Sequence, residues 1–154
     1  MQQSFRIDGL EELGKVISGL PVRLEKQVLR KVARAGATVA RKRIKAAAPA
    51  ETGPRSAASK KYGTLKSNIK VKNLKQRHRS EFACKVTTGN AFWGSFSEFG
   101  TSHQPAKPWF RPAFDGSQSA AFQKMAEVAV SGVEAAAKTL AGKYAKAKKA
   151  YGVR

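Results

Sequence analysis

The sequence predicts an α+β fold: two amino-terminal helices, then a three- or four-stranded antiparallel sheet, then a long carboxy-terminal helix. Apolar residues recur at helical spacing over 10–20 and 21–48, and apolar and polar residues alternate over 65–72. A helical rhythm of fours and threes returns after Pro112. Because 154 residues fit one modest core, we expect 1–154 to form a single domain.

The amino-terminal third predicts both helices. Asp8 suits the start of a short helix that Gly19 and Pro21 end, and Pro21 can itself begin a second helix that no breaker interrupts before Pro49. The second helix carries cationic side chains within roughly 100° of arc, opposite an apolar face. These residues, called the basic rail below, are Arg23, Lys26, Arg30, Arg34, Arg41 and Lys45. The rail is either a solvated face or a track for phosphate or an acidic neighbour.

Residues 49–64 combine proline, glycine, serine and threonine without periodicity, which predicts a long flexible loop. From Thr52 to Ser80 the chain has nine basic residues and no acidic one. Arg55, Lys60 and Lys61 in the loop therefore join the basic rail as candidate contacts to DNA or to an acidic protein. Simple solvation is the alternative for both groups.

Alternation over 65–72 predicts a strand with one wet, basic face. The stretches EFACKVTTG and AFWGSF are rich in β-formers on either side of Gly89 and Asn90, which predicts a hairpin, and Phe5 with Ile7 could add an edge strand. After Pro112 the chain is expected to be helical again. Its lysine-rich end, 141–154, is expected to fray.

The residues offer little for catalysis or cofactor binding. The ten acidic residues are scattered, and His78 and His103 have neither zinc-ligand spacing nor a recognisable catalytic context. Cys84 is the single cysteine, so no internal disulfide can form, and it is best read as a small buried hydrophobe on a strand. We expect no enzyme activity, no cofactor, no metal and no membrane partner, since no apolar run approaches the length of a membrane span. The net charge of +20 favours anionic partners.

Aromatic residues are concentrated in one proline-rich segment. Seven of the 13 aromatics fall between residues 92 and 114, together with three prolines that restrict the chain. Such density is typical of anchors that are buried either in a partner or in the subunit's own core. Glu98 lies between Phe96 and Phe99, so we expect it to be partly desolvated and paired with Arg111 or with an arginine of a neighbouring subunit.

Residues 96–114 read FSEFGTSHQPAKPWFRPAF, and their EFGT and PWFRPA parts resemble a family signature. The family is the tail-component family of long-tailed, lambdoid-type bacteriophages and prophages, of the tail-completion or head–tail joining (neck) type. FRIDGLEELGKVISGLP resembles the family's usual start, and AAAPAETG followed by LKSNI resembles its middle. The chain departs from the family at Trp109, a position commonly filled by something smaller, in a longer loop over 52–65 and in its high basic charge.

The resemblance implies a structural virion protein without enzyme activity. It implies a homo-oligomeric ring, a hexamer in the virion even if the free subunit is a monomer, which lies in the neck between capsid connector and tail tube or caps the tail during assembly. The implied partners are the connector or adaptor and the tail terminator or tube, and the implied locations are the virion and, during assembly, the host cytoplasm. DNA passing through such a ring would meet lumenal Lys and Arg, so the basic residues above are candidates for phosphate contacts or, equally, for acidic rims of neighbouring rings.

For a ring, one copy must insert an anchor into the next. We expect Phe99, Trp109 and Phe110 to insert and Glu98 to pair across the joint; closure of the subunit's own core is the alternative. The candidate interface residues are Phe96, Glu98, Phe99, Gly100, Thr101, Trp109, Phe110, Arg111 and Phe114. A small, non-specific nucleic-acid-binding protein is the alternative class, with the aromatics as a stacking platform. A nuclease is more remote because the acidic residues are few.

Overall fold

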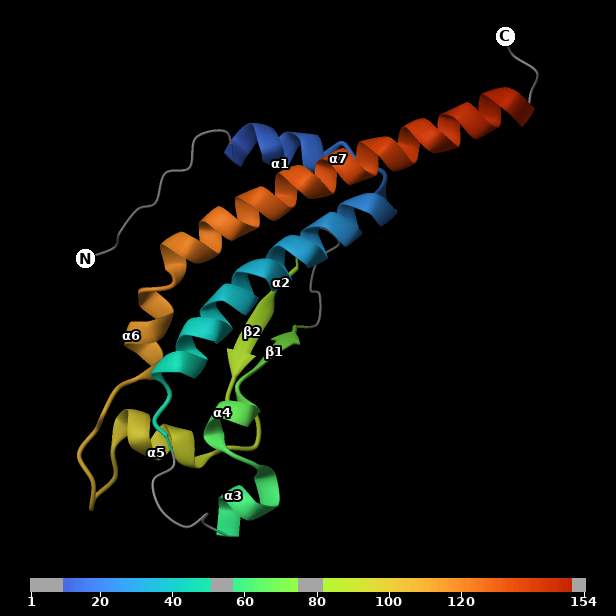
Figure 1. The fold of residues 1–154 in the computed structure, drawn as a ribbon. Coiled ribbons are helices and arrows are strands. Elements are labelled where there is room, and N and C mark those ends of the chain that lie inside the picture. The colour runs from blue at the N-terminus through green and yellow to red at the C-terminus, as the bar shows by residue number, and fades with distance from the viewer. Residues whose placement is uncertain (1–9, 51–56, 75–81, 151–154) are drawn as a thin grey trace.

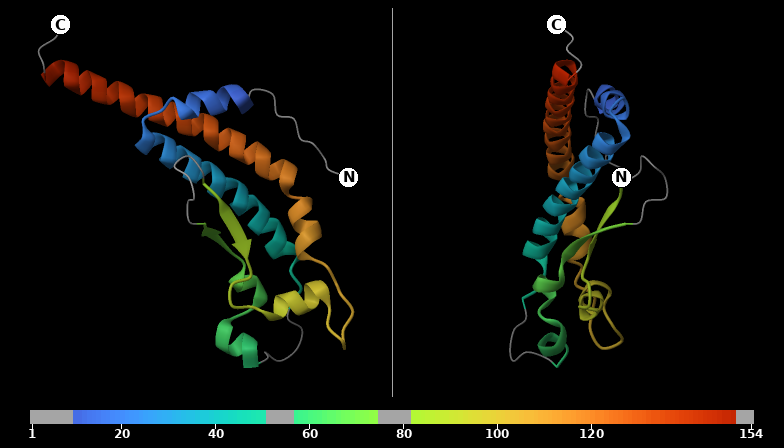
Figure 2. Two further views of the ribbon diagram at one scale, coloured as in Figure 1. Left: turned by 180° about the vertical axis from the view of Figure 1, so that it is seen from behind. Right: turned by 90° about the vertical axis from the view of Figure 1, so that its right-hand side faces the viewer.

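A computed structural model describes residues 10–50, 57–74 and 82–150 of the chain. The described part is mostly helical and contains one small antiparallel sheet. Helix α2 (Val22–Ala47) lies between helix α7 (Gln118–Ala150) and the sheet, as Figures 1 and 2 show. Helix α1 (Leu10–Ser18) packs against α7 and the first part of α2. The predictions of a short first helix, a long second helix and a long carboxy-terminal helix are confirmed.

Helices α2 and α7 pack closely because small residues lie where they cross. A Cβ atom on Gly36 would come within 2.5 Å of the Met125 Sδ atom, and one on Gly132 within 3.0 Å of a Val28 methyl carbon. Val28 is also part of a small core with Ile17 of α1 and apolar side chains of α7. At about 1.5 Å per residue, α7 is roughly 50 Å long and extends beyond α2 (Figure 1).

The sheet contains strands β1 (Lys70–Asn73) and β2 (Cys84–Thr87), paired antiparallel with Lys70 opposite Thr87 and Asn73 opposite Cys84. Both strands pack against α2. Three or four strands were expected, and the described residues contain two. The edge strand expected at Phe5 and Ile7 lies outside them.

The strand predicted to begin at residue 65 begins later. Its first residues form helix α4 (Leu65–Asn68), because the Thr64 side chain accepts a hydrogen bond from the Ser67 N–H at 3.3 Å and so caps the helix. Leu65 and Ile69, four residues apart, are both buried in the main core. Alternation was a misleading signal here, since the same apolar residues also fit a helical turn that leads into a strand.

The loop prediction for 49–64 is wrong for its later part, where helix α3 (Ala57–Tyr62) forms. Residues 51–56, including Arg55, lie outside the described residues. Gly63 follows α3 with a φ of 82°, a conformation that favours glycine. The buried Asn68 amide donates to the Tyr62 carbonyl at 2.7 Å and to the Thr64 carbonyl at 3.0 Å, which fixes the turn.

Residues AFWGSF, predicted as a strand, enter helix α5 (Trp93–Phe99) instead. The buried residues Ala91, Gly94 and Glu98 follow helical spacing, so burial on one face overrides the β-propensity of the aromatics. Gly89 and Asn90 do form a turn, but it leads into this helix and not into a hairpin partner. Helix α6 (Phe110–Asp115) follows, and α7 remains helical through Ala150, within the segment expected to fray.

Candidate interaction surface

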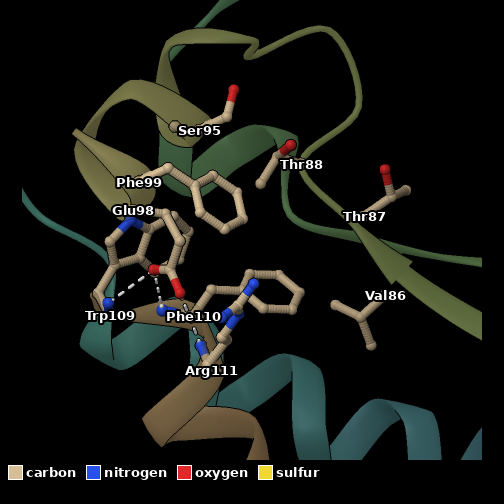
Figure 3. Close-up of a pocket in the computed structure, with 10 residues that line it drawn as sticks. Val86, Thr87, Thr88, Ser95, Glu98, Phe99, Trp109, Phe110 and Arg111 are labelled. Atoms are coloured by element: carbon tan, nitrogen blue, oxygen red, sulfur yellow. Dashed lines mark hydrogen bonds between the residues drawn. The ribbon is translucent and has the colours of Figure 1, made fainter. Parts of the chain in front are cut away.

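Glu98 is the structural anchor of the aromatic segment. It lies in the last turn of α5, and its side chain reaches the first turn of α6 (Figure 3). Its Oε2 atom accepts hydrogen bonds from the Trp109 N–H at 2.7 Å and the Phe110 N–H at 2.8 Å, and Oε1 accepts from the Arg111 N–H at 3.1 Å. Pro112 follows and has no N–H to donate. The carboxylate and this proline together account for the donors that the start of a helix leaves unpaired.

The carboxylate of Glu98 is 7% exposed, so the expected desolvation is confirmed. Burial raises its pKa, but the three backbone N–H groups, helped by the nearby Arg111 guanidinium, outweigh burial and lower the pKa from the usual glutamate value. The prediction that Arg111 is the hydrogen-bonding partner of Glu98 through its side chain is wrong, because the donors to this carboxylate are backbone N–H groups of its own chain. The Arg111 guanidinium instead lies over the Phe99 ring, with Cζ 5.0 Å from the ring centroid.

Trp109 closes the core of its own subunit. It is 7% exposed and packs with Ile44 of α2, Leu65 of α4 and other apolar side chains, while Phe110 packs against the same cluster at its edge. The Trp109 Nε1 atom is buried and has no hydrogen-bond partner among the described residues. Trp109 is therefore an intrachain core residue and not, as expected, an anchor that inserts into a neighbouring subunit.

Gly100 turns the chain out of α5 with a φ of 76°. A Cβ atom there would lie 2.7 Å from the Ala106 backbone nitrogen, so the position requires glycine. The residues that follow fold back on themselves, because Thr101 donates its N–H to the Gln104 carbonyl at 2.8 Å and Lys107 donates to the Ser97 carbonyl at 2.9 Å. Residues 101–108 are all exposed, so this is an ordered projecting arm.

Three phenylalanines of α5 and its N-cap form an exposed stripe. Phe92 is 53% exposed, Phe96 48% and Phe99 62%, and their spacing of four and three places them on one side of the helix. The Phe92 and Phe96 rings are edge to face, with centroids 5.8 Å apart. A stripe of this kind on a monomer is typical of an interaction site. We call Phe92, Phe96 and Phe99 the aromatic stripe.

The predicted interface residues thus separate into two groups. Those exposed are Phe96, Phe99, Thr101, Arg111 and Phe114, whereas Glu98 and Trp109 are buried and Gly100 and Phe110 are half-buried. Phe92 was not among the predicted interface residues, although it belongs to the aromatic stripe. Its helical spacing to Phe96 and Phe99 was the available signal.

The basic rail is present on α2. Arg23, Arg30, Arg34 and Lys45 are exposed, whereas Lys26 and Arg41 are half-buried. The Arg30 guanidinium lies over the Phe82 ring, with its Cζ 5.4 Å from the centroid. Lys60 and Lys61 are exposed on α3.

A second group of cations, which the rail did not include, surrounds an open cleft of about 570 Å³ between α2 and α7. Lys31, Lys42 and Lys124 line it together with Arg34 of the rail. Lys124 forms an ion pair with Glu127, Nζ to Oε1 at 2.7 Å. The signal in the sequence was the spacing of residues 31, 34, 38 and 42 along one side of a helix.

Among the described residues, no group of three or more His, Cys, Asp or Glu side chains could hold a metal ion. Within the same part of the chain, no helix is long and apolar enough to cross a membrane. The fold and surface define a small, basic, mostly helical protein with an exposed aromatic stripe beside a projecting arm.

Residues 10–100 match the family described as "Bacteriophage HK97-gp10, putative tail-component", and the chain belongs to this family of phage tail components. The match covers α1 to α5 and ends at Gly100, immediately after Glu98 and Phe99. No curated protein and no solved structure was found to match the chain.

Proposed function

We propose that this tail component completes the tail or joins it to the head, by forming or joining a ring in the neck between capsid connector and tail tube. The observation that carries the proposal is the aromatic stripe. A subunit that functioned alone would gain nothing from three half-exposed phenylalanines on one short helix, whereas a ring subunit needs such an anchor.

The contacts that hold the end of α5 against the start of α6, here called the α5–α6 corner, support the same proposal. Glu98 fixes α5 to α6, Trp109 fixes the corner to the core, and Gly100 allows the chain to fold back beside the stripe. The stripe is therefore preorganised, and little conformational entropy is lost when it docks.

The test is deletion of the gene from the phage or prophage that encodes it, followed by complementation. Wild-type protein should restore joined particles, and a variant with Phe96→Ser and Phe99→Ser should leave separate heads and tails in electron micrographs. Val130→Ser is the matched control, because Val130 is 49% exposed on α7, away from the stripe. Joined, infectious particles from the deletion itself would refute the proposed function.

Non-specific binding of nucleic acid is a second candidate, and the cationic cleft between α2 and α7 favours it. Four basic side chains around one cleft, on a chain of net charge +20, suit a phosphate backbone without reading its sequence. In a neck ring the two candidates are compatible, since DNA passes through the channel. An acidic rim of a neighbouring ring is the competing partner for the same cations.

A further inference from the structure

The aromatic stripe lies in the longest part of the chain that lacks positive charge. From Val86 to Ala106 there is no lysine or arginine, although the chain has 30 of them in 154 residues. The acidic residue in this range, Glu98, is buried and is used by α6. Two copies of a strongly basic subunit repel each other over most of their surfaces, and the repulsion is weaker here, where the one cation described above is the Arg111 guanidinium over the Phe99 ring.

A second apolar feature lies elsewhere on the subunit. An open hollow of about 710 Å³ is bounded by α2, β2 and the α6–α7 segment. Small side chains such as Ala33, Gly36 and Ala37 line it on the α2 side, and Phe114 and Phe122, each more than 40% exposed, line it on the other. Among the described residues, Lys85 is the one charged side chain that lines it. A cavity of about 150 Å³ accepts a benzene ring, so this hollow has room for several.

We propose that the aromatic stripe of one subunit inserts into this hollow of a second copy of the chain. None of the three stripe residues lines the hollow of its own subunit, so the two features cannot satisfy each other within one chain. The contact is therefore heterologous, the kind that closes into a ring when the rotation between copies permits. The inference rests on the proposed function, because it names the joint from which the ring would be built.

The size of the stripe sets what it can contribute. Taking about 200 Å² for a whole phenylalanine, three half-exposed rings would bury about 300 Å². A stable interface buries about 800 Å² per partner, so the stripe would be the central anchor and the surrounding surface would supply the rest. The neighbouring arm, residues 101–108, is exposed and projects from the same corner, so it could contact the second copy as well.

The chain provides its own probe, because its single cysteine, Cys84, lines the hollow. Ser95→Cys places a second thiol on α5 beside the stripe and retains all three phenylalanines. A short bismaleimide should then link the new thiol of one copy to Cys84 of another. The cross-linked subunits should form a ladder that extends beyond dimers to trimers and larger species. Peptide mass spectrometry should identify the link between positions 95 and 84.

Ser131→Cys is the matched control. Ser131 and Ser95 are both exposed helical serines whose hydroxyls donate to the carbonyl three residues earlier. Burial raises the pKa of the Cys84 thiol and slows its reaction, but it does so equally in both variants. We expect at least fivefold more linkage to Cys84 from position 95 than from position 131, and none after Cys84→Ser.

Filling the hollow provides the second readout. Ala37→Trp in the Ser95→Cys chain should suppress the ladder while the melting temperature stays near that of the parent. Equal linkage from positions 95 and 131, or a ladder that survives Ala37→Trp, would overturn the inference and assign the stripe to a different partner. The particle assay tests the proposed function separately. If the deletion abolishes joining but the cross-link does not form, the inferred joint is rejected and the neck role stands. If the cross-link forms but the deletion still yields joined particles, the neck role is rejected and the joint stands.

Discussion

Replacing Glu98 by glutamine tests whether this carboxylate holds the aromatic segment in place. The amide oxygen of glutamine can still accept hydrogen bonds from the Trp109 and Phe110 N–H groups. The amide nitrogen would then face the Arg111 N–H, and two donors cannot form a hydrogen bond. One hydrogen bond to a charged acceptor is lost, about 1.5–3 kcal/mol, and two others become neutral bonds of about half the strength. Relief of the desolvation penalty offsets part of this, so we expect a net loss of about 2–4 kcal/mol in the free energy of unfolding.

The assay is equilibrium urea unfolding followed by circular dichroism at pH 7. Glu127→Gln is the matched control, because it removes an exposed glutamate whose pairing with Lys124 at i,i+3 spacing is expected to contribute less than about 0.5 kcal/mol. If Glu98→Gln cost no more than this control, the carboxylate would not be organising the helix start. A charge swap with an arginine should not rescue the variant, because the partners are backbone groups.

The same variant predicts a pH dependence of known sign. The pKa of Glu98 is lowered in the folded state, so its contribution is fully present above the pKa of an unfolded glutamate and is lost as pH falls through the folded value. The stability gap between wild type and Glu98→Gln should therefore be constant from pH 6 to 8 and shrink in acid. A gap that widened in acid would refute the assignment of the ionised form.

Three further predictions concern the core, the turn and the cationic cleft. Trp109→Ala should cost about 3–5 kcal/mol in urea unfolding, and Trp109→Phe clearly less, since it keeps an aromatic ring and removes an unpaired buried N–H; equal losses would contradict a packing role. Gly100→Ala should cost at least about 2 kcal/mol in thermal unfolding, because a left-handed conformation and a backbone clash add together, and an unchanged melting temperature would argue against this turn. Replacing Lys31, Lys42 and Lys124 by glutamine should make the slope of log affinity against log salt concentration shallower by about three for a random DNA duplex. Fluorescence anisotropy measures the affinity, and an unchanged slope would show that the cleft is only solvated.

The long helices could be predicted from the sequence because their signals are redundant. Helix α2 has Pro21 at its start, Pro49 beyond its end and an apolar face sustained over many turns. Its bounds were therefore predicted to within a residue or two. For α7 the apolar rhythm predicts the long helix but not its start: one helix was expected from Pro112, whereas the structure has α6 and then α7 from Gln118.

The short elements could not be predicted in the same way. In residues 91–99 the aromatics fit a strand by propensity and a helix by spacing, and tertiary burial of Ala91, Gly94 and Glu98 decides the outcome. The partner of Glu98 was also out of reach. An isolated acidic residue in a basic chain suggests an arginine, whereas a helix start eleven residues later is visible only in the fold.

The division between buried and exposed aromatics explains why the segment is built as it is. A docking element must be fixed on one side so that it can remain exposed on the other without collapsing into the core. Glu98 and Trp109 supply the fixed side through backbone hydrogen bonds and core packing, and Phe92, Phe96 and Phe99 remain exposed on the same short helix. Serine at Phe96 should therefore leave the urea midpoint nearly unchanged while it impairs assembly, whereas alanine at Trp109 should lower the midpoint markedly through the loss of core packing. Both changes remove an aromatic side chain, so the contrast separates the docking function from the folding function.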